Sequence, residues 1–459
     1  MRPRAPQAQG AERGVALLMV ILAIAILTAV AVEFSYNSRV DLELATNQRD
    51  ELQAHYLAES GIGMSRLLLK FQKQVDAIQM PNIAGLMQQF MGGGSAPGGA
   101  AGATPGGTGA AAPPASLNIQ LWRIAHVDCH MLQGLIPANA GGTALGNVSL
   151  QAKGRTAAAS RSVSSSGRSY DEEFPELAAK QSRMSFGTFQ GCFSTKIEDE
   201  EQKLNVNQLD SVLLTEQATG LKLMAMLADK RFDFVFDTED ANHVKVPPQE
   251  VLINLRDWVD QDQTGATLNL TGTGNFFLKG SSDENGNYSR YTPSYHAKSS
   301  HFDSLDELYM VHGVNDRFMA AFRDRLTVYP DLNTGLNINS DDPVMLYMSI
   351  LAVGDPQRPD PRLKDPLFVD GIIQRIRQAR VMSFFGMSTS DFVTIVQAAG
   401  IAVNSSITTS TTQPNRFVTD KSSTFKIRST GEAGHVRRTI EAVVRLDDGL
   451  GRLVHWKEE

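Results

Sequence analysis

The feature that most restricts the fold of this chain is an uninterrupted apolar run near its N-terminus. Residues 15–32 contain one threonine and no charged side chain. As a helix, the run is roughly 27 Å long at 1.5 Å per residue, which matches the apolar core of a bilayer. The charged residues that precede it are Arg2, Arg4, Glu12 and Arg13. Because basic flanks stay in the cytoplasm, the run predicts a single-pass membrane helix with the rest of the chain exported.

The helix is expected to continue well beyond the membrane. Apolar residues recur at helical spacing from Ala54 to Leu69, and no proline occurs between Val15 and Met80. The pattern therefore predicts one helix over residues 15–70, apolar on all sides at first and amphipathic later. Two alternatives remain, an ordinary secretory signal that is cut after the run, and a plain anchor followed by a stalk.

The junction before the apolar run resembles the class III signal sequences of type IV pilins and type II secretion pseudopilins. In those families a prepilin peptidase cuts after a glycine and leaves the apolar helix on the mature protein. The resemblance implies a leader over residues 1–14 and cleavage between Gly14 and Val15. Most members carry glutamate at the fifth mature position, where this chain has Met19. The tip pseudopilins of the protein K family typically lack that glutamate, and the first subunit of a filament has no preceding amine to pair with it.

Two stretches of biased composition interrupt the rest of the chain. Residues 92–116 are nearly all Gly, Ala, Pro, Ser and Thr, which predicts a flexible linker over residues 71–116. A serine-rich stretch over residues 141–170 predicts a disordered insert. Both stretches look like insertions relative to the protein K family that the leader resembles.

The remaining sequence predicts an α+β head whose antiparallel sheet forms late in the chain. Residues 424–429 and 436–446 are typical of two strands joined by a GlyGluAlaGly turn. A LeuAsnValAsn segment at 204–207 has a near copy, LeuAsnIleAsn, at 336–339. We expect these segments to be adjacent strands at which an inserted helical domain leaves and rejoins the parent fold.

The order of these features resembles the protein K family of type II secretion minor pseudopilins along most of the chain. The stretches that carry the resemblance are 198–207, 255–265, 304–313 and 336–340. In that family a pilin-type α/β domain contains a large inserted helical domain. The resemblance therefore implies a pilin-like domain formed by residues 117–208 and 336–459, with a helical domain inserted over residues 209–335.

The sequence that begins at Asp260 fits the start of a calcium loop, with oxygen ligands at alternate positions and glycine at the sixth. An EF-hand is excluded because Thr271 stands where a bidentate glutamate is required. We expect a looser calcium site, and tip pseudopilins of this type can carry calcium in the helical domain. The candidate ligands are Asp260, Asp262, Asp283 and Asp303. The alternative is a helix C-terminal turn with solvated acids.

Three further features bear on the chemistry. Cys129 and Cys192 are the two cysteines, and outside the cytoplasm they form either one disulfide or two buried thiols. Residues 198–201 are all acidic, which predicts a solvated turn, with a second cation site or a docking patch as the alternative. The nine histidines show no metal-binding spacing, and the chain has no GxSxG elbow or P-loop.

These observations predict an assembly protein and not an enzyme. A net charge of −7 argues against binding to nucleic acid. The resemblance implies a minor pseudopilin in the bacterial inner membrane, with its head in the periplasm, that caps the pseudopilus tip. Its expected partners are other minor pseudopilins, the prepilin peptidase, the inner-membrane secretion platform, the secretin and secreted cargo. The alternatives are a tip minor pilin of a type IV pilus and a membrane-tethered periplasmic enzyme.

Overall fold

The computed structural model describes most of the chain outside two long stretches. The described residues are 11–77, 118–124, 127–129, 185–186, 189–237, 239, 245–270, 274–355, 358–380, 385–404, 407, 417–447 and 449–459. The insert predicted over 141–170 lies outside them. So does the linker predicted over 71–116, except for residues 71–77, which are helical.

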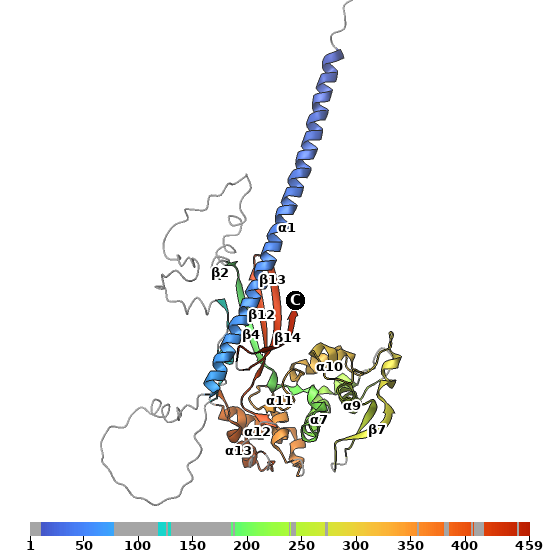
Figure 1. Ribbon diagram of the computed structural model, residues 1–459, viewed down its shortest axis with the longest axis vertical. Helices are drawn as coiled ribbons and strands as arrows, with labels where there is room; N and C mark the ends of the chain where they lie inside the picture. The colour runs from blue at the N-terminus through green and yellow to red at the C-terminus, as the bar shows by residue number, and fades with distance from the viewer. Residues whose placement is uncertain are drawn as a thin grey trace, which may run out of the picture.

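The chain begins with one very long helix, α1 (Ala11–Ala77), of 67 residues. Its first half projects as a rod beyond the rest of the molecule, and its second half lies along the sheet (Figure 1). Every side chain from Leu17 to Ala45 is exposed. By length and composition, α1 is long and apolar enough to cross a membrane, and it lies near the N-terminus, as a signal or anchor helix does.

The second half of α1 packs on a four-stranded antiparallel sheet. The strands are β4 (Cys192–Asp199), β12 (Thr424–Ala433), β13 (Val436–Arg445) and β14 (Arg452–Glu458). Their order is β14-β13-β12-β4, so the predicted hairpin forms the centre of the sheet. Gly434 makes the hairpin turn possible, since its φ of +56° is a conformation that other residues avoid.

The interface between α1 and the sheet is apolar and unusually close. The residues that form its core are Ala58, Ile62, Leu69, Phe425, Ile427, Ile440, Ala442 and Val444. A side chain at Gly431 would overlap the carbonyl oxygen of Ala54 and lie 2.6 Å from the Ala58 nitrogen. The helix backbone therefore rests directly on β12, which only glycine permits at this position.

Two helical bodies follow β4, and their apolar cores meet at the helix Pro343–Val353. One face of that helix contributes Val344, Met345 and Met348 to the first core, and the other contributes Leu346 and Ile350 to the second. The first contains η1 (Glu200–Gln202), β5 (Leu204–Asn205), η2 (Val206–Asp210), α7 (Leu213–Leu227), η3 (Lys230–Phe232), α8 (Asp233–Phe236), α9 (Pro248–Val259), β6 (Thr264–Leu268), β7 (Phe277–Asp283), η4 (Glu284–Gly286), η5 (Tyr288–Arg290), η6 (Leu305–Met310), α10 (Asp316–Phe322), η7 (Arg323–Arg325) and β8 (Leu326–Thr327). The second contains β9 (Leu336–Asn337), α11 (Pro343–Val353), η8 (Pro361–Lys364), α12 (Pro366–Ala379), β10 (Phe385–Gly386), α13 (Thr389–Ala398) and β11 (Val418–Thr419). The remaining short elements are β1 (Asn118–Ile119), α3 (Leu121–Ile124), β2 (Ser185–Phe186) and β3 (Phe189–Gln190).

Each of the two repeated LeuAsn segments opens one helical body. They do not pair with each other, because β5 pairs in parallel with β8, and β9 pairs in parallel with β11. The last asparagine of each segment then links separate loops of its own body. Asn207 joins the Phe302 amide (2.8 Å) to the Val328 carbonyl (2.9 Å), and Asn339 accepts from the Met387 amide (2.7 Å). The two similar sequences therefore make similar hydrogen bonds in two different bodies. The prediction that they form adjacent strands was wrong.

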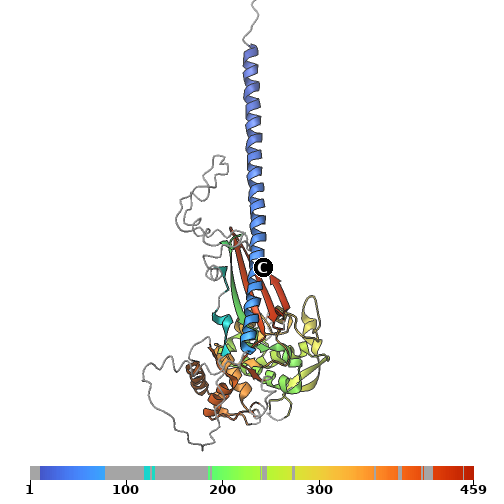
Figure 2. The same ribbon diagram turned by 60° about the vertical axis from the view of Figure 1, so that its left-hand side comes forward.

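The prediction of an α+β fold with a pilin-like arrangement is confirmed. A long N-terminal apolar helix packs on an antiparallel sheet, and additional helices accompany it. Both helical bodies lie at the end of the sheet that is remote from the N-terminus, as the two views show (Figures 1 and 2).

Candidate functional site

A cluster of buried carboxylates at the end of α9 is the candidate site. Proline at the start of α9 favours a helix there, and Val251, Leu252 and Leu255 direct one face of the helix into the core. Asp257 and Asp260 lie on the last turn and just beyond it, and both are buried. Two acids three residues apart share one face of a helix, so their carboxylates are neighbours.

The third member of the cluster, Glu284, comes from the hairpin that follows. β6 and β7 pair antiparallel, and the register places Asp283 opposite Thr264, close to the end of α9. The next residue, Glu284, is therefore brought back beside the helix that the chain has just left. One carboxylate oxygen from each of Asp257, Asp260 and Glu284 lies within 4.8 Å of the other two.

Few hydrogen-bond donors contact the oxygens of these three carboxylates. Asp257 accepts from the Ala266 amide (3.0 Å), and Asp260 accepts from Arg256, whose guanidinium also contacts Glu216 (3.1 Å). One oxygen of Asp260 and both oxygens of Glu284 are buried and have no hydrogen-bond partner in the described part of the chain. Buried carboxylate oxygens nearly always have a partner, and a bound cation could supply one to these three oxygens.

The electrostatics support the same conclusion. Burial raises the pKa of Asp257 to about 6 and that of Asp260 to about 7, against the opposing effect of Arg256. Burial, together with the Asp260 and Asp257 carboxylates, raises the pKa of Glu284 to about 8. Three negative charges at this spacing repel one another, and a divalent cation would relieve that repulsion.

Oxygen ligands from several carboxylates are what Ca²⁺ and Mg²⁺ bind in proteins. Asp257, Asp260 and Glu284 are therefore the residues that fit a divalent cation. The tolerance of Ca²⁺ for six to eight ligands in irregular geometry suits a site in which water completes the shell.

The structure places the four predicted calcium ligands in different surroundings. Asp260 lies in the cluster. Asp262 lies near it but is half exposed, and the Thr264 amide (2.7 Å) lowers its pKa. Asp283 is exposed and accepts from the Asn285 amide (3.0 Å), while Asp303 is exposed and pairs with Lys298 (2.7 Å).

The sequence prediction missed Asp257 and Glu284. Asp257 carries a signal that was readable, because it lies three residues before Asp260 on a helix with an apolar opposite face. Glu284 follows Asp283 directly, and only the register of the hairpin decides which of the two acids turns inward.

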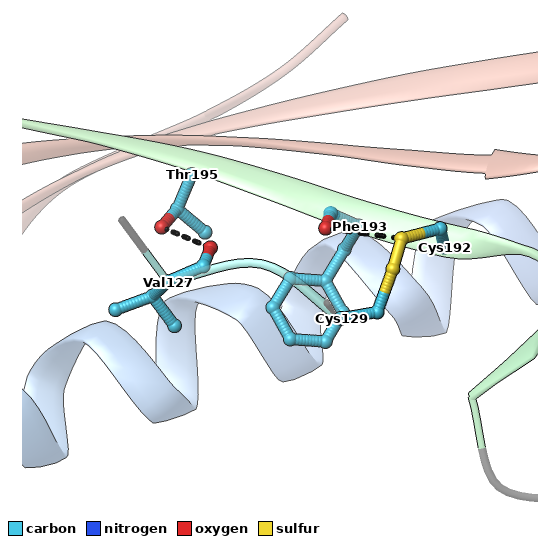
Figure 3. Close-up of a disulfide and its surroundings, with 5 residues drawn as sticks. All are labelled: Val127, Cys129, Cys192, Phe193 and Thr195. Atoms are coloured by element: carbon cyan, nitrogen blue, oxygen red, sulfur yellow. Dashed lines mark hydrogen bonds between the residues drawn. A yellow bond between two sulfur atoms is a disulfide. The ribbon is translucent and has the colours of Figure 1, made fainter. Parts of the chain in front are cut away.

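The two cysteines are joined. Cys129 and Cys192 form a disulfide with their Cα atoms 5.7 Å apart (Figure 3). Beside it, Val127 accepts from the amide (3.1 Å) and the hydroxyl (2.7 Å) of Thr195. The bond therefore fixes residues 127–129 against the start of β4, next to α1.

The acidic run at 198–201 is not the solvated turn that the sequence predicts. Asp199, Glu200 and Glu201 are all buried. Each carboxylate holds a different part of the head, since Asp199 accepts from Asn337 (3.0 Å), Glu200 from Lys203 (2.6 Å) and Glu201 from the Ser423 amide (3.0 Å). Burial raises the pKa of Asp199 to about 7, with the Glu201 carboxylate as the next cause. The prediction was wrong because the donors to Asp199 and Glu201, Asn337 and Ser423, lie far away in the sequence; only Lys203, the donor to Glu200, is local.

The expected cleavage point lies within α1. The backbone of Gly14 and Val15 is helical, and the helix begins at Ala11, slightly before the predicted start. Cleavage between them stays a prediction.

Comparison with known proteins gives a likeness only to solved structures, and it is distant. No family model matches the chain, and no curated protein matches it. Among solved structures, it is similar to a chain of the GspK-GspI-GspJ complex of the type 2 secretion system from enterotoxigenic Escherichia coli. That match has 14% identity and a TM-score of 0.36, and covers 60% of this chain and 82% of the other.

Proposed function

We propose that this protein is a minor pseudopilin that caps the tip of a type II secretion pseudopilus and acts by assembly and not by catalysis. The observation that carries the proposal is α1, which is exposed and apolar in its first part and packed on an antiparallel sheet in its last part. One unbroken helix of this kind can anchor a subunit in a membrane and hold its head outside. The basic leader that ends in Gly14 supports the same assignment.

The shape of the head supports a place at the tip. The two helical bodies lie beyond the far end of the sheet, in line with and beside α1 (Figures 1 and 2). A further subunit stacked above this one would meet these bodies. Met19 agrees with such a position, because a first subunit has no preceding N-terminal amine for an acid to pair with.

The proposal includes a calcium ion at Asp257, Asp260 and Glu284. The unpartnered oxygens of Asp260 and Glu284 support it. A bound cation would join the end of α9 to the β6–β7 hairpin and so stabilise the first helical body. The proposed role of the ion is structural and not catalytic.

The proposed partners are other minor pseudopilins, the prepilin peptidase and the inner-membrane secretion platform, with the secretin and cargo as contacts of the head. The proposed location is the inner membrane, with a single pass and a periplasmic head. A chain that starts with an apolar helix would pack that helix with the helices of its neighbours.

The first test is the intact mass of the mature protein from its own host. We expect a chain that begins at Val15, and a Gly14→Ala variant that stays uncut. A Gly10→Ala variant is the matched control, because it changes a glycine of the leader outside the cleavage point. A mature chain that begins after residue 30, or an uncut native chain, would remove the assignment to the pilin class.

The second test is the position of the protein in the filament. Gold labelling of an epitope added after Glu459 should mark one end of each pseudopilus, and deletion of the gene should stop export across the outer membrane. Label along the shaft would refute the tip position. Loss of pili with normal secretion would instead support a type IV pilus tip subunit.

A further inference from the structure

The last part of α1 has a second apolar face, beside the one that packs on the sheet. We call it the α1 apolar face, and its members recur at spacings of three and four residues: Met64, Leu67, Leu68, Phe71 and Val75. Phe71 is 51% exposed and Leu67 is 39% exposed, whereas Met64 and Leu68 are half-buried against the small core around Val127. A row of this kind on an exposed helix is typical of a face that another element covers.

The charged residues of this stretch lie on the other side of the helix. Arg66 donates to the Leu450 carbonyl (3.1 Å) and Lys73 donates to the Asp447 carbonyl (2.7 Å), both between β13 and β14. Lys70 is four residues after Arg66 and shares that side. Arg66, Lys70 and Lys73 are all the charged residues between Met64 and Val75, so the side with the α1 apolar face has no charge there.

The chain leaves the described part of the structure just beyond this face, at Ala77, and returns at Asn118. Residues 78–117 contain no charged side chain. Between Pro81 and Gly92 the large apolar residues recur at spacings of three and four, and they are Ile83, Leu86, Met87, Phe90 and Met91. Proline before such a row and glycine after it are typical signals of the start and end of a helix. The spacing therefore predicts an amphipathic helix over residues 82–91.

The two apolar patterns match when the chain reverses direction between them. The matching pairs, each equally distant from residue 79, are Val75 with Ile83, Phe71 with Met87, Leu68 with Phe90 and Leu67 with Met91. Residues 78–81 provide a connection of the length found in hairpins of two antiparallel helices, which is about 2–5 residues. Ten residues of helix extend roughly 15 Å, which is also the length of α1 from Leu67 to Ala77.

We propose that residues 82–91 form a helix that packs antiparallel on the α1 apolar face and covers Leu67 and Phe71. The short connection from Ala77 gives this segment a high effective concentration at the face, so it competes well with any separate chain. Both surfaces are apolar and uncharged, and their contact would remove Leu67 and Phe71 from water. The inference does not depend on the proposed function.

The first test is a cysteine cross-link in the full chain, solubilised in detergent. The native cysteines are joined to each other, so the added thiols are the reactive ones. In Phe71→Cys/Met87→Cys, mild oxidation should form a disulfide within one chain, which peptide mapping identifies. The control is Lys73→Cys/Met87→Cys, because Lys73 points to the opposite side of α1 at a similar sequence separation. The first pair should react roughly tenfold faster or more, as its thiols are held together.

The second test is hydrogen exchange, which needs no variant to fold. In the native chain, the amides of residues 86–91 should be protected about tenfold or more relative to those of residues 95–110. Phe71→Asp should remove this protection, because it places a charge in the apolar contact. Gln74→Asp is the matched control, since Gln74 is exposed on α1 outside the α1 apolar face, and it should keep the protection.

Three results would overturn the proposal. The first is an equal rate of cross-linking in the two cysteine pairs. The second is equal exchange of residues 86–91 and 95–110 in the native chain. The third is a cross-link that joins two chains in place of one, because a second copy would then occupy the face.

Discussion

The close contact between α1 and β12 makes Gly431 the position at which the smallest change should separate the helix from the sheet. In Gly431→Ala, the new methyl group meets two backbone atoms, the oxygen of Ala54 and the nitrogen of Ala58. Backbone atoms cannot rotate away as a side chain would, so α1 as a whole must move. Overpacking of a core costs about 1–3 kcal/mol, and we expect about 3 kcal/mol here because both obstacles are backbone.

Hydrogen exchange of the full chain in detergent measures this cost locally. The amides between Ala54 and Leu69 should lose protection in Gly431→Ala by roughly a hundredfold, which corresponds to about 3 kcal/mol. Gly63→Ala is the control, since Gly63 lies on the outer face of the same helix and its added methyl meets no atom within 4 Å.

That control variant should be neutral or more stable by up to about 1 kcal/mol, because alanine favours a helix over glycine. Unchanged protection in Gly431→Ala would refute the close contact. An equal loss of protection in Gly63→Ala would show that the effect does not come from the interface.

The carboxylate cluster and the disulfide give three further predictions. Glu284→Gln should weaken calcium binding, measured by calorimetry, at least tenfold. Asp303→Asn is the control, because Asp303 is exposed and paired with Lys298, and it should leave the affinity unchanged. Equal losses in the two variants would contradict the site. Calcium affinity should fall as the pH drops from about 8 to about 6, because protons then compete with calcium for the three carboxylates. Their pKa values are raised to about 6 for Asp257, about 7 for Asp260 and about 8 for Glu284. An affinity that does not change with pH would refute this. Replacement of both disulfide cysteines by serine should cost about 2–4 kcal/mol in urea unfolding, and no loss would show that the bond adds little.

Calcium affinity should rise with pH, but the stability of the calcium-free protein should fall as the pH rises. Glu284 has a pKa of about 8 in the folded state against 4.5 for an unperturbed glutamate. Between these values the folded state binds more protons than the unfolded state, so the stability falls as the pH rises. Stability of the calcium-free head that increased with pH over this range would contradict the burial of uncompensated acids.

The sequence was sufficient for those features that depend on near neighbours. The apolar run and the helical spacing up to Leu69 predict α1, because a helix is encoded by residues three and four apart. The hairpin of β12 and β13 follows from alternation around the Gly434 turn.

The features that the sequence did not predict all depend on distant partners. Asp199, Glu200 and Glu201 resemble a solvated turn until their donors, contributed from as far away as Ser423, are known. The carboxylate cluster is a second example. Only the register of β6 with β7 shows that Glu284, and not Asp283, belongs to it. Nothing local reveals which of several acids faces inward.

The continuity of α1 has a mechanical consequence. A helix that runs without a described break from Ala11 to Ala77 has no hinge between its exposed apolar part and the head. An axial displacement at the N-terminal end therefore reaches the head at full amplitude, and a rotation turns the head by the same angle. Under the proposed function, a subunit inserted beneath this helix would displace the sheet and both helical bodies together, by the full length of the insertion step.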